Sequence, residues 1–92
     1  MSIPLDRASD TVLYDMFYES GTILNCYLMT LEDHAIASGK HKEAQSFRDE
    51  SFNLLDEREA TASHDRSRQI TLKEKWDTRR NQLDETYPTL FE

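Results

Sequence analysis

Histidine, cysteine and carboxylate side chains are the groups in this sequence that could bind a metal ion or carry out catalysis. The three histidines lie beside carboxylates, in the pairs His34 with Asp33, His41 with Glu43, and His64 with Asp65. Metal sites built on helices instead place their ligands three or four residues apart, so that the side chains share one face. No histidine here has another type of metal ligand at that spacing. We therefore expect no metal site.

The groups that enzymes use for phosphate binding and nucleophilic attack are not arranged for that chemistry. A phosphate-binding loop needs closely spaced glycines, and the chain has two, Gly21 and Gly39. Cys26 has no histidine at helical spacing and lies among apolar residues, so we expect a buried structural cysteine. Adjacent carboxylates such as Glu32 and Asp33 diverge around a helix and cannot share a proton. The sequence predicts no enzymatic activity, no catalytic residue and no cofactor, which leaves binding to another macromolecule.

Two tyrosines and two acids near the N-terminus form the first candidate for such binding. Tyr14 and Tyr18 stand one helical turn apart, beside Asp15 and Glu19. Packing in the core is one interpretation of these aromatic residues. A docking face is the other, because tyrosine is enriched at the energetic centres of protein interfaces and acids rim it here.

Trp76 is the second candidate, and it has the same two interpretations. Arg79 and Arg80 follow it by one helical turn. A cation–π stack on the helix surface is one interpretation, and contact with a protein partner is the other.

Charge is distributed unevenly along the 92 residues. Eighteen acidic and eleven basic side chains give a formal net charge of −7. Residues 1–60 hold twelve acids and five bases, whereas residues 61–92 hold six of each. Such a surface repels phosphate backbones, so direct nucleic-acid binding is disfavoured. The acidic part is suited to a basic protein surface, such as the cleft of an enzyme that handles phosphorylated substrates.

The elements that position these residues are expected to be helices, because two glycines and two prolines leave little from which strand turns could be built. Helical spacing predicts a single domain over 1–92, an all-α antiparallel three-helix arrangement with helices at about 10–37, 42–60 and 71–87. Gly21 predicts a weak point or kink in the first helix, and Gly39 predicts its stop. Thr71 and Glu74 suggest a capping box for the third helix. The apolar stripe of the first helix comprises Leu13, Phe17, Leu24, Leu28, Leu31 and Ala35, and is widened by Met16, Ile23 and Tyr27.

A helical hairpin with a long second helix is the alternative architecture. No glycine or proline interrupts residues 40–87, and the helical phase carries through them. One helix over residues 41–86 would project beyond the first helix as an arm.

The compartment follows from the single cysteine and from hydropathy. One cysteine cannot form an internal disulfide, which suits a reducing compartment, and no apolar run is long enough to span a membrane. No basic segment followed by an apolar run stands at the N-terminus. We expect a cytoplasmic protein without membrane contact.

Residues 64–70, of sequence HDRSRQI, and residues 76–80, of sequence WDTRR, resemble small bacterial antitoxins encoded beside zeta-type toxin kinases. The resemblance loosely covers residues 14–85 and implies a three-helix protein that occludes the nucleotide or substrate site of a toxin enzyme. Residues 10–28 would then be the blocking element. Ser46 and Glu50 also resemble the inhibitory helix of antitoxins of Fic-type transferases, but Ser51 stands where that motif expects glycine or asparagine.

Three functions are therefore open at the level of sequence. The first is an intracellular inhibitor, most simply an antitoxin, with Tyr14, Asp15, Tyr18, Glu19 and Trp76 as partner-binding residues. The second is a structural or adaptor protein that self-associates through a helical bundle. The third, mimicry of nucleic acid, is favoured by charge and opposed by the neutral C-terminal third.

Overall fold

The computed structural model describes residues 7–90, which contain three α-helices and no strand. Helix α1 spans Asp10–Ala37, α2 spans His41–Glu59 and α3 spans Arg66–Thr86. The all-α three-helix prediction is confirmed. The alternative of one helix over residues 41–86 is wrong, because residues 60–65 are not helical. Of the domain expected over 1–92, residues 1–6 and 91–92 lie outside the described part.

The ends of α1 follow from local hydrogen bonding. The Ser9 side chain accepts a hydrogen bond from the Val12 N–H at 3.2 Å and caps the start of the helix. At the other end Gly39 has a φ of 74°, and the Lys40 N–H donates to the Ala35 carbonyl at 2.8 Å. Glycine adopts this left-handed conformation without strain, so the predicted stop is confirmed.

Helix α3 starts earlier than the expected residue 71. The Asp65 side chain accepts from the Arg68 N–H at 3.2 Å and caps the helix, which begins at Arg66. Thr71 and Glu74 therefore lie inside α3, and the predicted capping box is wrong. Aspartate at the cap was sufficient to start the helix five residues before the threonine.

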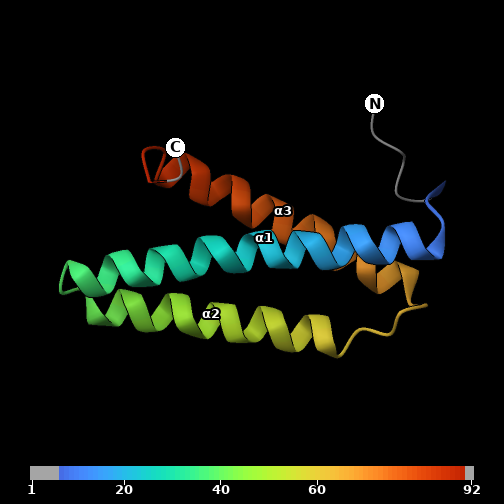
Figure 1. Ribbon diagram of the computed structural model, residues 1–92, viewed down its shortest axis with the longest axis horizontal. Helices are drawn as coiled ribbons and strands as arrows, with labels where there is room; N and C mark the ends of the chain where they lie inside the picture. Colours follow the sequence, from blue (N-terminus) through green and yellow to red (C-terminus); the bar gives the residue numbers. More distant parts are fainter. Residues whose placement is uncertain (1–6, 91–92) are drawn as a thin grey trace.

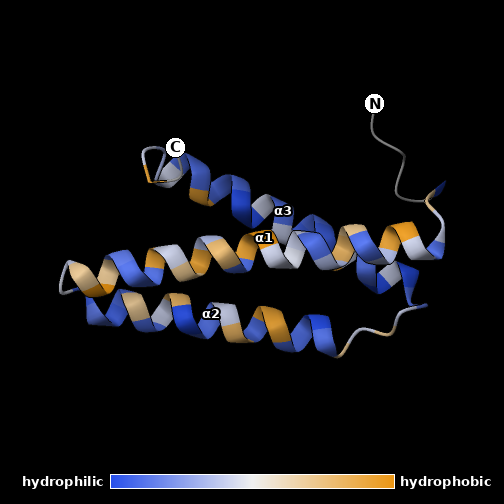
Figure 2. Cartoon of the chain, viewed as in Figure 1, coloured by the Kyte–Doolittle hydropathy of each residue, from blue (hydrophilic) through white to orange (hydrophobic). Residues whose placement is uncertain are grey.

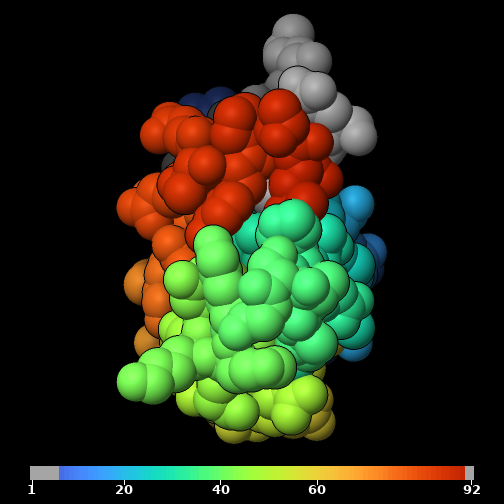
Figure 3. Space-filling model, turned by 90° about the vertical axis from the view of Figure 1, so that its left-hand side faces the viewer, coloured from blue at the N-terminus to red at the C-terminus, as the bar shows by residue number. Residues whose placement is uncertain are grey.

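The three helices form a flat arrangement with α1 in the middle (Figure 1). Helix α2 returns antiparallel along one side of α1, and α3 crosses its other side. The Cα atoms extend over 45 × 29 × 14 Å. The end view in Figure 3 shows the turn between α1 and α2 in green, with the C-terminal end of the chain in red above it. Helix α1 is thus the element against which both other helices pack.

The core is built mainly from α1, which carries most of the hydrophobic colour in Figure 2. The six main residues of its predicted stripe are buried, whereas the three that widen it, Met16, Ile23 and Tyr27, are half-buried. Helices α2 and α3 contribute fewer apolar side chains, and the Phe17 and Trp76 rings stack with centroids 5.2 Å apart. The buried cluster comprises Phe17, Leu24, Leu28, Leu31, Leu54, Leu72, Trp76 and Leu83.

Gly21 does not break α1, which is continuous through it. A Cβ atom at this position would lie 3.1 Å from Cζ3 of Trp76 and 3.3 Å from Cδ of Arg58. The glycine therefore lets side chains from α3 and α2 approach the α1 backbone closely. Its predicted role as a weak point is replaced by a role in packing.

Cys26 is exposed, so the expectation of a buried cysteine is wrong. The buried α1 residues nearest to it are Leu24 and Leu28, each two positions away. Two residues correspond to about 200° around a helix, which places Cys26 on the outer side.

Candidate partner-binding face

Four of the five predicted partner-binding residues surround one shallow hollow on α1. Tyr14, Asp15, Tyr18 and Glu19 line it together with Thr22, around a volume of about 380 Å³. Residues four apart on a helix share a face, so Tyr18 lies beside Tyr14 and Glu19 lies beside Asp15. These four residues are called the acidic aromatic face below.

The two tyrosines differ in how firmly the fold holds them. Tyr14 is partly buried against the core, and its ring centroid lies 5.9 Å from that of Phe17. Tyr18 is 45% exposed, with its centroid 6.1 Å from that of Tyr14. Tyr14 is therefore both a core residue and a surface residue, as the two interpretations made from sequence proposed. Tyr18 is mainly a surface residue.

Arg58 of α2 fixes Tyr18 in place. Its Cζ atom lies 3.8 Å from the centroid of the Tyr18 ring, which is a cation–π contact. Its Nη1 atom also donates to the Tyr18 carbonyl at 3.2 Å and to the Thr22 hydroxyl at 2.9 Å. The position of the ring is set by two helices, which reduces the conformational entropy that a bound partner would have to remove.

Asp15 and Glu19 are exposed, and within residues 7–90 neither has an ion-pair or hydrogen-bond partner for its carboxylate. Other acids are engaged. The five that form ion pairs with lysine or arginine, at distances of 2.6–2.9 Å, are Asp10, Glu32, Glu50, Glu57 and Asp77. The acidic aromatic face therefore presents two carboxylates that form no ion pair, beside the Arg58 guanidinium on Tyr18.

Trp76 does not belong to this face. Its side chain is 2% exposed, and it lines the groove of about 660 Å³ between α2 and α3, together with Leu24 and Leu54. The indole Nε1 is buried without a hydrogen-bond partner. Trp76 is a core residue. Neither a surface cation–π stack nor contact with a protein partner, the two interpretations made from sequence, describes it fully.

Arg79 pairs across this groove with Glu50 of α2, by Nε at 2.7 Å and Nη2 at 2.9 Å. The hydrogen bond to Glu50 raises the pKa of the Arg79 guanidinium, against the opposing effect of burial. Lys75 pairs in the same way with Glu57 at 2.8 Å. Two ion pairs thus link α2 to α3 across the groove whose apolar lining includes Leu24, Leu54 and Trp76.

No protein-family model, curated protein or solved structure matches this chain. The geometry of its own residues is therefore the basis for any statement about function.

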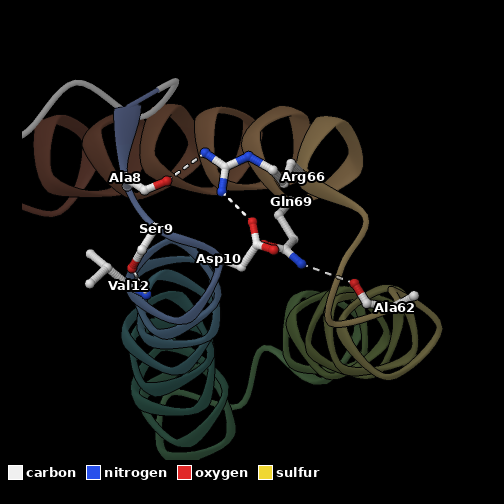
Figure 4. A network of polar contacts seen from close by, with 7 residues as sticks. All are labelled: Ala8, Ser9, Asp10, Val12, Ala62, Arg66 and Gln69. Atoms are coloured by element: carbon white, nitrogen blue, oxygen red, sulfur yellow. Dashed lines mark hydrogen bonds and ion pairs between the residues drawn. The ribbon is translucent and has the colours of Figure 1, made fainter.

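A polar network anchors the start of α1 (Figure 4). Arg66 donates from Nη1 to the Asp10 carboxylate and from Nη2 to the Ala8 carbonyl, both at 2.6 Å. Gln69, which is fully buried, donates from Nε2 to the Ala62 carbonyl at 2.9 Å. Arg66 and Gln69 were expected to lie before the third helix, although Asp65 is a residue type that caps helices and signals the earlier start.

Within residues 7–90, no group of three or more histidine, cysteine, aspartate or glutamate side chains could hold a metal ion. No helix in that part of the chain is long and apolar enough to cross a membrane. The acidic aromatic face is the strongest candidate site that remains.

Proposed function

We propose that this chain is a cytoplasmic inhibitor protein, an antitoxin that neutralises a toxin enzyme by covering its nucleotide or substrate site with the N-terminal half of α1. The observation that supports this proposal is the pairing of Asp15 and Glu19, which form no ion pair within residues 7–90, with two tyrosine rings around one exposed hollow. Catalysis and a cofactor have no part in it.

The partner surface that this face suits is basic and binds phosphate. Carboxylates on α1 would take the positions of phosphate oxygens against lysine and arginine side chains, as charge-assisted hydrogen bonds. The tyrosine rings would supply apolar contact area with few torsions to immobilise. The net charge of −7 would steer the two proteins together and raise the association rate at low salt.

Genetic context provides the first test. The product of the neighbouring gene should be a toxic enzyme with a phosphate-binding loop, and coexpression of this chain should restore growth. A neighbour whose expression leaves growth unaffected, and which does not bind the purified chain, would rule out the antitoxin proposal.

A charge-matched pair of double variants tests the face itself. Asp15→Asn with Glu19→Gln should weaken binding to the partner by about ten- to a hundredfold, mainly through a slower association rate. Asp33→Asn with Glu43→Gln removes the same charge from exposed positions near the turn between α1 and α2. This control should retain most of the affinity, and equal losses in the two variants would assign the effect to net charge alone.

The tyrosines require separate treatment because Tyr14 is partly buried. Tyr18→Ala should weaken binding while changing stability little beyond the loss of the Arg58 contact, about 1 kcal/mol at an exposed site. Tyr14→Ala should reduce both binding and stability. Measuring the free energy of unfolding beside the dissociation constant separates the two effects.

A further inference from the structure

Three large apolar side chains lie exposed on the outer side of the hairpin formed by α1 and α2. Met29 is 52% exposed, Ile36 46% and Phe52 58%. Met29 and Ile36 are seven residues apart, about two helical turns, and so lie on the same side of α1. These three residues are called the hairpin patch.

Hydrogen bonds place the α1 and α2 parts of the hairpin patch near each other. The Asn25 amide donates to the Met29 sulfur at 3.5 Å, and the Ser51 hydroxyl donates to the Asn25 side-chain oxygen. The second bond places Ser51 beside Asn25, Phe52 follows Ser51 directly, and Met29 is one turn from Asn25, so Met29 and Phe52 lie within about two turns of each other along the hairpin. Ile36 borders a shallow hollow that is also lined by Glu32 and Arg48.

The hairpin patch is not needed to build the core. The buried residues of α1 lie on its other side, and the core cluster contains neither Met29, Ile36 nor Phe52. Single exposed apolar residues are common on protein surfaces, but here three of the five exposed large hydrophobic residues within 7–90 gather on one side of one hairpin. Such gathering is typical of a surface that another molecule covers.

The charge at the hairpin patch differs from that of the acidic surface elsewhere. Arg48 donates from Nε to Glu32 at 2.9 Å, in the middle of the patch, so charges of both signs are present and cancel. The Arg48 side chain remains 51% exposed. A basic partner of the kind suited to the acidic aromatic face would therefore find no net negative charge at this ion pair.

A second copy of the chain fits these charges. Two acidic chains with a net charge of −7 repel each other least where both signs are present. In a two-fold arrangement the same patch serves both copies, so Arg48 of each could approach Glu32 of the other while the apolar side chains cover one another. We propose that the hairpin patch is a self-association surface through which two copies form a symmetric dimer with four helices at the interface.

The size of the patch sets the expected strength of the dimer. Met29 to Ile36 covers about 10 Å of helix, so the interface falls at the low end for protein complexes. Association should therefore be weak and should appear in the upper micromolar range. Tyr18 of the acidic aromatic face lies on the same side of α1, but about 16 Å along the helix from Met29. The proposal does not depend on the proposed inhibitor function.

Sedimentation velocity of the full chain from about 10 µM to about 1 mM tests the proposal. The wild type should shift from monomer to dimer over this range. Met29→Gln with Phe52→Gln should raise the dimer dissociation constant at least about tenfold. Both positions are exposed, so circular dichroism and the melting temperature of the dilute double variant should match those of the wild type.

Val12→Gln is the matched control, because Val12 is also an exposed apolar residue of α1, at 40%, and lies outside the hairpin patch. It should leave the dissociation constant within about twofold of the wild type. Asp15→Asn with Glu19→Gln should likewise leave the dimer intact, which separates this surface from the acidic aromatic face. A wild type that stays monomeric, or equal weakening by the control and the patch variant, would overturn the proposal. A monomeric wild type whose binding to a foreign partner needs Met29 and Phe52 would overturn it too, and would assign the patch to that partner.

Discussion

Gly21→Ala should destabilise this protein, although the same change in an ordinary helix interior stabilises by about 1 kcal/mol. The new methyl would lie 3.1 Å from Cζ3 of Trp76 and 3.3 Å from Cδ of Arg58. The Arg58 methylene belongs to a flexible side chain and can move. Trp76 is 2% exposed and stacked on Phe17, so moving its ring would disturb the packing of the core.

The magnitude follows from these two opposed effects. Overpacking a core costs about 1–3 kcal/mol, and the gain in helix propensity offsets about 1 kcal/mol of it. We expect a net loss of about 1 kcal/mol, which lowers the melting temperature by about 4–8 °C in a domain of this size. Urea denaturation followed by circular dichroism measures the change directly.

The background carrying Trp76→Phe shows whether the indole is responsible. Phenylalanine lacks the fused benzene ring of the indole, which carries Cζ3. In this background Gly21→Ala should therefore stabilise by up to about 1 kcal/mol. The coupling between the two sites would then be about 2 kcal/mol. If Gly21→Ala stabilises the wild type, or if the coupling is below about 0.5 kcal/mol, the steric argument fails. Gly39→Ala is the control: its φ of 74° makes alanine unfavourable, and no atom lies within 4 Å of its Cβ, so its cost should be equal in both backgrounds.

Three further predictions concern the helices. Leu24→Ala and Leu28→Ala, at 2% and 0% exposure, should each cost about 2–5 kcal/mol of unfolding free energy, measured by urea denaturation; a loss below 1 kcal/mol would show that the sites collapse without a cavity. Helix α2 has no side-chain cap at Lys40, so Lys40→Asp should stabilise by about 1 kcal/mol, and an unchanged melting temperature would contradict this. Burial, together with the hydrogen bond to Asp84, raises the pKa of the Tyr27 phenol above 10.0. Because the folded state then holds this proton more tightly than the unfolded state, the stabilisation is present below pH 10 and is lost as pH rises through the folded pKa; Tyr27→Phe should flatten this alkaline decline in melting temperature.

The fold could be predicted from sequence where one apolar stripe dominated. Helix α1 has the expected bounds, and α2 differs from expectation by one residue at each end, because Gly39 and the stripe of α1 are strong local signals. The start of α3 could not be predicted as well. Its first turn is polar, and the burial of Gln69 depends on tertiary contacts that local pattern does not contain.

The acidic aromatic face was predicted well because its residues are one turn apart on a single helix. The environment of Trp76 was not, since it depends on Gly21 and Phe17, which lie more than fifty positions away in sequence. Cys26 shows a related error: an apolar neighbourhood in sequence does not give burial unless the residue has the phase of the stripe.

The Arg66 contacts also have a consequence for the order of folding. Arg66 meets Asp10 across 56 positions in sequence, whereas the Arg48–Glu32 pair of the hairpin spans 16. Closing the longer loop costs about 1 kcal/mol more conformational entropy, and contacts between near neighbours form sooner. We therefore expect the α1–α2 hairpin to form first and α3 to dock last. A chain emerging from the ribosome would then present its acidic aromatic face before the helix that completes its core has been synthesised.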